Sequence, residues 1–276
     1  MAFSVNTNAS ALSALFNLNK TTIQLERTQT AINTGLKVAS AKDNAAIFAI
    51  AQKLRGDLKG YNAVKQSLDR SISTTDIALA AAGAISDLLI EMREKAVAAA
   101  DGGFDATSRS ALNEDFQALR DQISTIVSNS EFNGANLIDS GTDAIVAITN
   151  PTASQTISIA HQNLTLGGGN VLITAAQAIT TQTTAAATLT LVDTSLENVS
   201  RVLTKFGAGG KSLESQRVFS DMISDTIQIG IGNLVDANMA KESANLQALQ
   251  VKQQLGIQAL AIANQAPQSI LSLFGN

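Results

Sequence analysis

Apolar residues recur at intervals of seven near the start of the chain. One series is Val5 and Leu12, and a second is Leu18, Leu25, Ile32 and Ala39. A seven-residue repeat places side chains on one seam of a helix, as in paired helices. The pattern predicts a helix over residues 1–39, loosened near its end by Thr34-Gly35.

A longer series of sevens predicts an extended second helix from Asn44 to about Ala100. Its length exceeds that of an ordinary globular helix and indicates a coiled-coil-like rod. Ser40-Ala41-Lys42-Asp43 has the pattern of a capping box with Asp at the fourth place. Asp101-Gly102-Gly103 predicts the end of the helix. The series consists of Leu54, Tyr61, Leu68, Thr75, Ala82, Leu89 and Ala96.

A third helix is predicted from about Thr107 to Asn129, and a β- or loop-rich region follows it. Asn133-Gly134 predicts a tight turn, and in residues 135–190 charge almost vanishes. Thr156–Ile159 and Val171–Thr174 have the pattern of short strands, which predicts one or two β-hairpins. The Thr-rich residues 180–190 fit either a loop or a strand. The stripe of the third helix is Leu112, Phe116, Leu119, Ile123 and Ile126.

Helical spacing returns near Leu191. The glycine cluster 207–210 interrupts this pattern and predicts a bend or break, because each glycine costs about 1 kcal/mol against alanine inside a helix. A last helix is expected from about Asp236 to Asn264, ending before Pro267. The chain therefore divides into residues 1–43, 44–190, 191–235 and 236–276. The returning helix carries Val192, Leu196, Val199, Leu203 and Phe206 on one face, and Phe206, Leu213, Ser220, Ile227 and Leu234 continue at intervals of seven.

Both ends of the chain lack charge, since no charged residue occurs in residues 1–19 or after Lys252. The last helix is moreover apolar on two opposite faces, and such a helix is buried on both. One face could pack on the N-terminal helix and the other on a second copy, or the end helices could form the centre of the chain's own core. The first face carries Val251, Leu255, Gln258, Ala259 and Ile262, and the second carries Leu246, Leu249, Ile257 and Leu260.

The scarcity of large side chains favours assembly over a private core. Aromatic residues make up 4% of the 276 residues and there is no Trp, so little bulk is present to bury both faces. We therefore expect the apolar residues of the two end helices to pack against each other and against neighbouring copies. These subunit-packing candidates are Val5, Leu12, Leu18, Leu25, Ile32, Leu246, Leu249, Val251, Leu255, Ile257, Leu260 and Ile262.

The composition of the chain gives no indication of a catalytic or metal site and argues against nucleic acid as a partner. A net charge of −4 does not attract a phosphate backbone, so nucleic acid is not expected. Without cysteine, and with His161 as the single histidine, disulfides and thiolate or multi-histidine metal sites are excluded. The glycine clusters lack the setting of a phosphate loop, so neither enzymatic activity nor a cofactor is expected. The start of the chain is no secretory signal peptide, and no stretch has the ~18 apolar residues of a membrane helix. By these signals alone the protein would be cytoplasmic.

Three stretches, in order and at matching distances from each end, resemble bacterial flagellins, the subunits of the flagellar filament. The resemblance covers about residues 1–139 and 189–276. Flagellins are mainly α-helical, and the matching stretches are Ser40-Ala41-Lys42-Asp43-Asn44-Ala45-Ala46, Glu131-Phe132-Asn133-Gly134 and Ala263-Asn264-Gln265-Ala266-Pro267-Gln268-Ser269-Ile270-Leu271-Ser272-Leu273.

The resemblance implies an architecture and a route out of the cell. Terminal helices would pair into an inner domain lining a channel, and the remainder would form an outer antiparallel helical rod with a small β-hairpin region. Large outer domains are missing, so this would be a minimal flagellin. Export through the flagellum's own type III apparatus, a flagellar export chaperone, a filament cap and a secreted homopolymer are implied, which reverses the cytoplasmic expectation. A secreted coiled-coil adhesin or a hook–filament junction protein stays the alternative.

The family resemblance also concerns an innate-immune receptor. Many flagellins are recognised by Toll-like receptor 5 through a Gln-Arg pair, a nearby Arg and a Leu on the long outer helix. The matching positions here are Ile90, Glu91, Arg93 and Lys95, so only the nearby Arg is kept. Because a charge is reversed and another replaces an apolar contact, we expect weak or no recognition.

Overall fold

The computed structural model describes residues 7–142 and 144–274, with side chains described up to Gln265. Over these residues the chain is mainly helical, with two short antiparallel strand pairs. It divides into two compact units: a terminal unit of residues 1–56 and 226–276, and a central unit of residues 57–225. The elements are α1 (Ala9–Thr34), α2 (Ala45–Ala100), α3 (Ala106–Asn129), β1 (Glu131–Phe132), β2 (Ala135–Asn136), β3 (Ile145–Ile148), β4 (Thr156–Ile159), α4 (Gln182–Val235) and α5 (Met239–Phe274).

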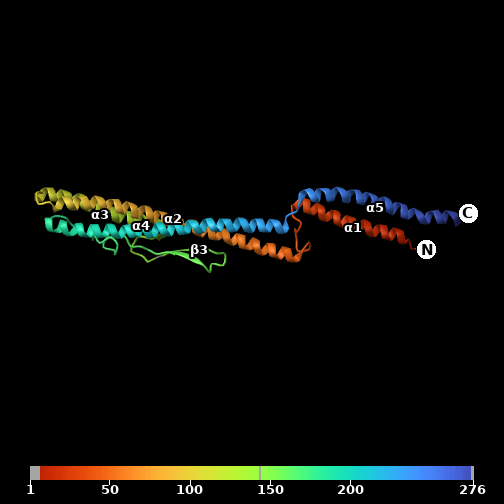
Figure 1. Cartoon of the computed structure of the whole chain (residues 1–276), viewed down its shortest axis with the longest axis horizontal. Helices are drawn as coiled ribbons and strands as arrows, with labels where there is room; N and C mark the ends of the chain where they lie inside the picture. The colour runs from red at the N-terminus through yellow and green to blue at the C-terminus, as the bar shows by residue number, and fades with distance from the viewer. Residues whose placement is uncertain (1–6, 143, 275–276) are drawn as a thin grey trace. The chain divides into compact units, whose positions relative to one another are not determined.

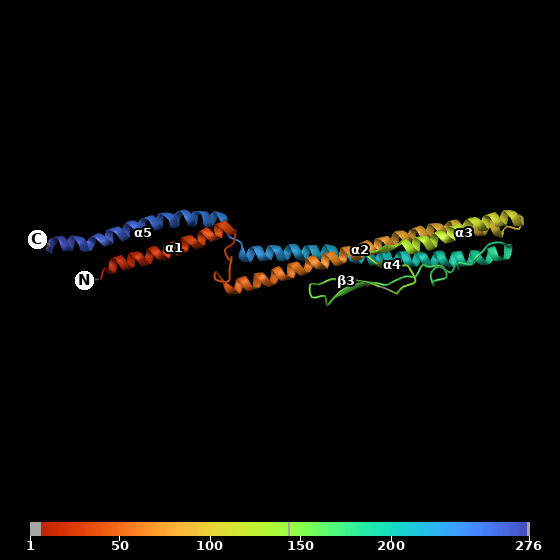
Figure 2. The same ribbon diagram turned by 180° about the vertical axis from the view of Figure 1, so that it is seen from behind.

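In the terminal unit α1 and α5 lie side by side and antiparallel (Figures 1 and 2). Asn8 caps α1, accepting a hydrogen bond from the Ala11 N–H at 3.1 Å. Gly35 ends it in the left-handed conformation with φ of 72°, which glycine adopts without strain. The predicted helix over residues 1–39 is therefore too long at its C-terminal end.

Inside the terminal unit, the residues that follow α1 are hydrogen-bonded to the end of α4 and to the residues that precede α5. The Lys37 N–H donates to the Val235 carbonyl at 2.8 Å, and the Ala237 N–H donates to the Gly35 carbonyl at 2.8 Å. Leu36 and Asp236 form an isolated antiparallel bridge between them. The chain thus leaves α1 and enters α5 through one paired crossing.

Asp43 organises the turn before α2. Its carboxylate accepts hydrogen bonds from the backbone N–H groups of Ala39 and Ser40, at 3.1 and 2.9 Å, and from the Ser40 hydroxyl at 3.1 Å. These Ser40 bonds hold the pKa of Asp43 below its ordinary value. The helix cap itself is Asn44, whose side chain accepts from the Ile47 N–H at 3.1 Å. A capping box was predicted here, but the capping residue lies one position past it.

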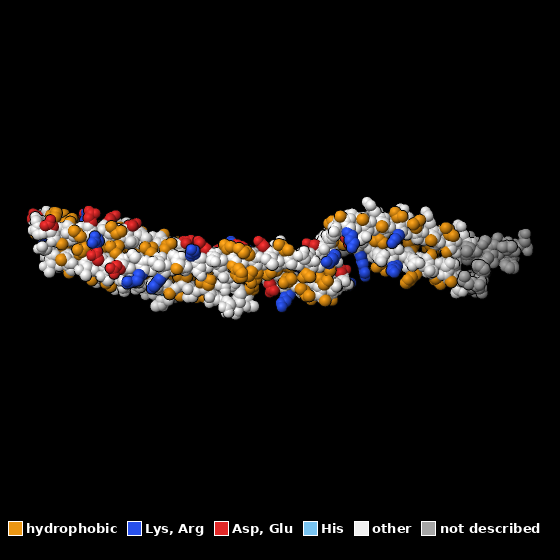
Figure 3. All heavy atoms as spheres, viewed as in Figure 1, with side chains coloured by type: hydrophobic (Ala, Val, Ile, Leu, Met, Phe, Trp, Pro, Cys, Tyr) orange, Lys and Arg blue, Asp and Glu red, His pale blue; other side chains and the backbone are white. Residues whose placement is uncertain are grey.

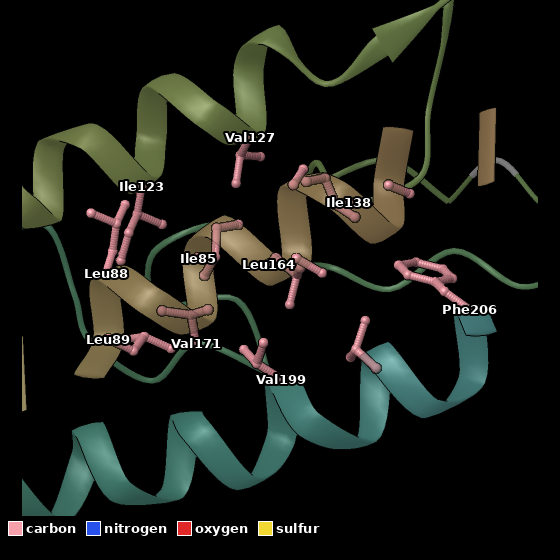
Figure 4. Close-up of a cluster of buried hydrophobic side chains, with 14 of the residues drawn as sticks. Ile85, Leu88, Leu89, Ile123, Val127, Ile138, Leu164, Val171, Val199 and Phe206 are labelled. Carbon is pink, nitrogen blue, oxygen red and sulfur yellow. The ribbon is translucent and has the colours of Figure 1, made fainter. Parts of the chain in front are cut away.

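The central unit is a bundle in which α3 and α4 run antiparallel to α2 (Figure 1). The series of sevens along α2 is its core seam, because Leu68, Ala82 and Leu89 are fully buried there. Phe116 of α3 and Phe206 of α4 are fully buried as well. Figure 4 shows the centre of this core, where side chains from the three helices meet Ile138, Leu164 and Val171 of the segment between α3 and α4.

The segment between α3 and α4 contains two hairpins. Strands β1 and β2 are joined by Asn133 and Gly134, with φ of 52° and 81°, the backbone that a two-residue type I′ turn requires. Strands β3 and β4 pair from Ile145 opposite Ile159 to Ile148 opposite Thr156. Between elements, helix side chains satisfy the backbone: the Ile179 N–H donates to Asn113 Oδ1 at 2.8 Å.

Two glycines let the β3–β4 hairpin lie close on the helices. A Cβ added at Gly60 of α2 would come within 2.5 Å of Pro151 Cβ in the hairpin turn. A Cβ at Gly209 of α4 would come within 2.9 Å of Ile159 Cδ1 in β4. This packing explains why α4 runs unbroken through the glycine cluster, against the predicted bend or break: close contacts offset the low helix propensity.

Three further predictions of secondary structure differ from the structure. Val171 forms only an isolated parallel bridge with Leu166, so the predicted strand 171–174 is wrong, whereas the strand Ile145–Ile148 was missed. Residues from Gln182 onward are helical, not loop or strand. Helix α5 starts later than predicted and continues through Pro267 to Phe274.

Candidate subunit-packing surfaces

One face of α1 forms the seam against α5. Leu25 is 8% exposed, and Leu18 and Ile32 are half-buried. Leu18 lies over Gly256 of α5, where an added Cβ would come within 3.2 Å of Leu18 Cδ1. Glycine thus allows the two helices to approach closely at this point. Val5, the first packing candidate, lies outside the described residues.

One face of α5 completes this seam. Leu246 and Leu260 are half-buried and Leu249 is buried. Between them Gln253 and Gly256 are also half-buried, so the covered positions follow alternating steps of three and four. This is the spacing of a coiled-coil seam. The structure therefore brings together Leu18, Leu25 and Ile32 with Leu246, Leu249 and Leu260.

The opposite face of α5 is apolar and lies open in the chain. Val251, Leu255 and Ile262 are 54%, 57% and 68% exposed. We call these three residues the α5 outer stripe. Ile257, predicted to share a face with Leu246, Leu249 and Leu260, is itself more than half exposed and lies beside the seam. A step of 100° per residue puts Ile257 about 60° from the seam's centre, which accounts for its exposure.

Helix α1 has an outer stripe too, made of Leu12, Phe16 and Ile23. Phe16 is 70% exposed, and Leu12, placed on the packing face by its spacing from Val5, is 62% exposed. Phe16, Ile23 and the neighbouring Leu15 were not among the predicted residues. The signal that could have found them is a second apolar series at steps of four and seven inside or next to the uncharged segment 1–19.

A groove of about 390 Å³ lies between the start of α1 and the later part of α5. Leu12, Leu15 and Leu260 supply its apolar lining, and Asn8 and Asn264 add uncharged amides. Among the residues that the structure describes, no charged side chain lines this groove. Such a site suits an apolar side chain rather than an ion or a charged metabolite. Figure 3 shows the described surface of the terminal unit as mostly hydrophobic and uncharged groups, with some Lys and Arg side chains and few acidic ones on this face.

The four positions matched to receptor recognition lie on α2 in the central unit. Ile90 and Glu91 are exposed. Arg93 donates from Nε to Asp193 of α4 at 2.6 Å, and Lys95 pairs with Asp115 of α3 at 3.1 Å. Both cations are therefore engaged inside the chain.

Catalytic or metal chemistry finds little support in the described residues. Among them no group of three or more His, Cys, Asp or Glu residues could hold a metal ion. His161 is half-buried against Asp139, with Nε2 and Oδ1 3.0 Å apart, and the pair links two parts of the segment between α3 and α4. Helix α2 is long and apolar enough to cross a membrane by length and composition alone. A core helix passes the same test, and 44% of its most apolar window is buried, so this is weak evidence for a span.

Family comparison accounts for both helical regions. Residues 5–143 match the bacterial flagellin N-terminal helical region, and residues 189–274 match the C-terminal helical region. The chain belongs to the bacterial flagellin family. Flagellin FljK of Caulobacter vibrioides is 44% identical over 98% of both chains, and flagellin FljN of that organism is 47% identical over 98% of both. A flagellin of Brucella melitensis is 33% identical over 98% of this chain and 99% of its own.

Solved structures share the fold. A crystal structure of Bacillus cereus flagellin has a TM-score of 0.50 at 22% identity, covering 55% of this chain and 87% of that one. A putative flagellar hook-associated protein from Vibrio parahaemolyticus has a TM-score of 0.57 at 13% identity, covering 70% and 100%. The mainly α-helical fold class is confirmed. As a flagellin, this chain is a structural subunit of the flagellar filament that serves motility, and it is not an enzyme.

Proposed function

We propose that the outer stripes of α1 and α5 are the surfaces through which copies of this flagellin pack in the filament. One observation carries the proposal: α5 is covered by α1 on one face, yet its opposite face exposes Val251, Leu255 and Ile262. Exposed apolar groups in a row mark an interaction surface. The seam residues would then hold the pair together, while the outer stripes contact other copies.

The absence of charge supports the same proposal. When many identical copies pack closely through these helices, the same side chains of neighbouring copies come near one another. A charged side chain there would be repelled by the like charge on the next copy. Residues 1–19 and 253–276 carry none. The uncharged groove between Leu12, Leu15 and Leu260 fits an apolar side chain of a neighbouring copy. On this proposal residues 1–43 and 236–276 are the inner part of the subunit, and 44–190 with 191–235 the outer part.

The test compares two lysine substitutions on α5. Leu255→Lys places a charge on the outer stripe, whereas Gln250→Lys places it on an exposed polar position of the same helix. We expect Leu255→Lys to raise the critical concentration for assembly more than about 10-fold, because burying an unpaired charge costs several kcal/mol. Gln250→Lys should change it less than about 2-fold. Equal effects of the two would contradict the assignment. Truncations lacking residues 1–20 or 255–276 should form no filaments at all.

Family membership further supports export by the flagellum's own apparatus as a secreted subunit, with an export chaperone and a filament cap as partners. The expected test is loss of the extracellular protein in cells that lack the flagellar export gate. Accumulation outside such cells would contradict this route.

We also propose that this flagellin is a weak ligand for Toll-like receptor 5. At the matched positions Ile90 and Glu91 stand where a Gln-Arg pair is required, and Lys95 where a Leu is required. The retained Arg93 is tied to Asp193 at 2.6 Å, so a receptor would have to compete with an internal partner. An interface arginine is commonly among the residues that contribute most to binding.

A gain of recognition tests this proposal. The triple variant Ile90→Gln, Glu91→Arg, Lys95→Leu should raise potency in a receptor reporter assay at least about 10-fold, since each restored anchor is worth about 1 kcal/mol or more. Glu94→Gln, which raises the net charge by the same single unit at an exposed neighbour, serves as the control and should leave potency unchanged. Full potency of the unmodified depolymerised protein would overturn the proposal.

A further inference from the structure

Helix α5 contains a proline in its interior, and a proline there removes one backbone hydrogen bond of the helix. Pro267 has no backbone N–H, and in an α-helix that group would donate to the carbonyl four residues earlier, which is Ala263. The helix nevertheless continues from Met239 to Phe274. The Ala263 carbonyl therefore needs a donor from outside α5.

Asn8 of α1 is that donor. Its Nδ2 lies 2.7 Å from the Ala263 carbonyl oxygen, across a separation of 255 residues in sequence. The same side chain caps α1, because its Oδ1 accepts from the Ala11 N–H at 3.1 Å and from the Ser10 hydroxyl at 2.9 Å. One amide thus serves the first turn of one helix and the proline turn of the other.

This double task restricts the residue at position 8. Asp, Ser and Thr cap helices about as well as Asn. A carboxylate, however, has no hydrogen to donate, and a hydroxyl is one bond shorter than the amide arm. Of the good capping residues, Asn alone offers a side-chain acceptor and an N–H donor together. The choice of Asn8 is explained by α5 and not by α1 alone.

We propose that Asn8 is a positioning residue whose amide replaces the hydrogen bond that Pro267 removes, so that it fixes the register of α1 on α5 and makes the two chain ends order together. Without α5, the Asn8 amide keeps only its capping role. Without Asn8, the Ala263 carbonyl is left to water in a half-buried position. The inference concerns contacts within one subunit and does not depend on which surface neighbouring copies cover.

A double-mutant cycle on the full chain tests the link. Asn8→Ser keeps a capping oxygen but removes the amide donor, and Pro267→Ala restores an N–H that can serve Ala263 from within α5. We expect Asn8→Ser to raise the critical concentration for filament assembly about 5- to 10-fold, as for a lost hydrogen bond to a poorly solvated group. In the Pro267→Ala background the same substitution should raise it less than about 2-fold.

Hydrogen exchange in assembled filaments distinguishes positioning from simple capping. In Asn8→Ser filaments the amides of residues 9–12 and those of residues 264–266 should both exchange faster, and Pro267→Ala should reverse the change in the second group. Asn19→Ser, at an exposed position of α1, is the control and should affect neither α5 nor the cycle.

Two results would overturn the proposal. One is an equal effect of Asn8→Ser with and without Pro267→Ala, which would mean that the amide serves only α1 or that water satisfies Ala263. The other is faster exchange confined to residues 9–12. If Asn8→Ser abolishes assembly altogether, Pro267→Ala must restore it, and failure to do so counts against the link.

Discussion

The terminal and central units are both built from antiparallel helices with apolar residues at intervals of seven, yet they differ in what their helices leave uncovered. In the central unit Phe116 and Phe206 are fully buried in a core made by three helices and the segment between α3 and α4. In the terminal unit two helices cover each other on one face only, and Phe16 is 70% exposed. One unit completes its core within the chain, and the other does not.

Charge follows the same division. Across the central unit's helices Arg217 of α4 pairs with Asp69 of α2 at 2.8 Å, and Arg93 pairs with Asp193 at 2.6 Å. The terminal unit's outer stripes lie in or beside segments without charge. A seven-residue repeat thus identifies a helix that pairs with another helix. The residues outside the repeat decide whether apolar surface stays exposed after the two helices have paired.

The largest expected effect separates two phenylalanines. Phe206→Ala should lower the free energy of unfolding of the free subunit by about 3–5 kcal/mol, because it opens a cavity in a closed core. Phe16→Ala should change it by less than about 0.5 kcal/mol, since that ring is exposed in the chain. Urea unfolding of both variants as monomers measures the difference. Comparable losses of stability would mean that Phe16 is buried in a hydrophobic core formed within the single chain.

A second comparison uses two glycines of α2. Gly60→Ala should cost about 1–3 kcal/mol, because the new Cβ would meet Pro151, a rigid ring. Gly83→Ala has no atom within 4 Å of the new Cβ and should instead stabilise by about 0.5–1 kcal/mol. Thermal unfolding of the two variants checks this. A stabilising Gly60→Ala would show that the hairpin turn is not seated on α2.

A smaller effect is expected at the surface ion pairs of the central unit. Arg217 contacts Asp69 and also Asp221 in the next turn of α4. Arg217→Met should lower stability by about 0.5–1 kcal/mol at low salt, because exposed pairs contribute little. In about 1 M salt, where screening is nearly complete, the difference from the unmodified protein should almost disappear. A loss that persists unchanged in salt would indicate packing by the arginine stem.

The smallest expected effect is a loss of stability at low pH, to which one carboxylate in each unit contributes. Hydrogen bonds from Ser40 hold the pKa of Asp43 below its ordinary value, and hydrogen bonds from Ser108 do the same for the pKa of Asp105 at the start of α3. A group whose pKa is lowered by folding contributes stability above its ordinary pKa and loses it as pH falls through the folded value.

The measurement is the free energy of unfolding followed downward from about pH 5. Asp105→Asn keeps a capping side chain that does not titrate, so its loss of stability in acid should be shallower than that of the unmodified protein. Asp76→Asn, at an exposed position inside α2, is the control. If Asp105→Asn lost stability in acid in the same way as the unmodified protein, protonation of Asp105 would not contribute to the pH dependence of stability.

Much of the fold was predictable because helical periodicity is a local property. The residues of the α2 seam, the α3 stripe and the face of α4 with Val199 and Phe206 are buried or half-buried, as the spacing predicts. The hairpins were harder, since Ile145–Ile148 and Val171–Thr174 are both short apolar runs and only pairing distinguishes them. Of the packing candidates, Leu25 and Leu249 lie on the seam, while the contacts of the outer stripes with other copies stay a prediction.

Spacing and charge alone predict that this chain makes long paired helices with uncharged ends, because both are properties of neighbouring residues in the sequence. Where those helices stop depends on tertiary contacts. Helix α4 continues past its glycines because Ile159 packs on Gly209. Helix α5 continues past Pro267 while the Asn8 amide serves the Ala263 carbonyl from the other end of the chain. Both contacts join residues far apart in sequence, and no local pattern contains them.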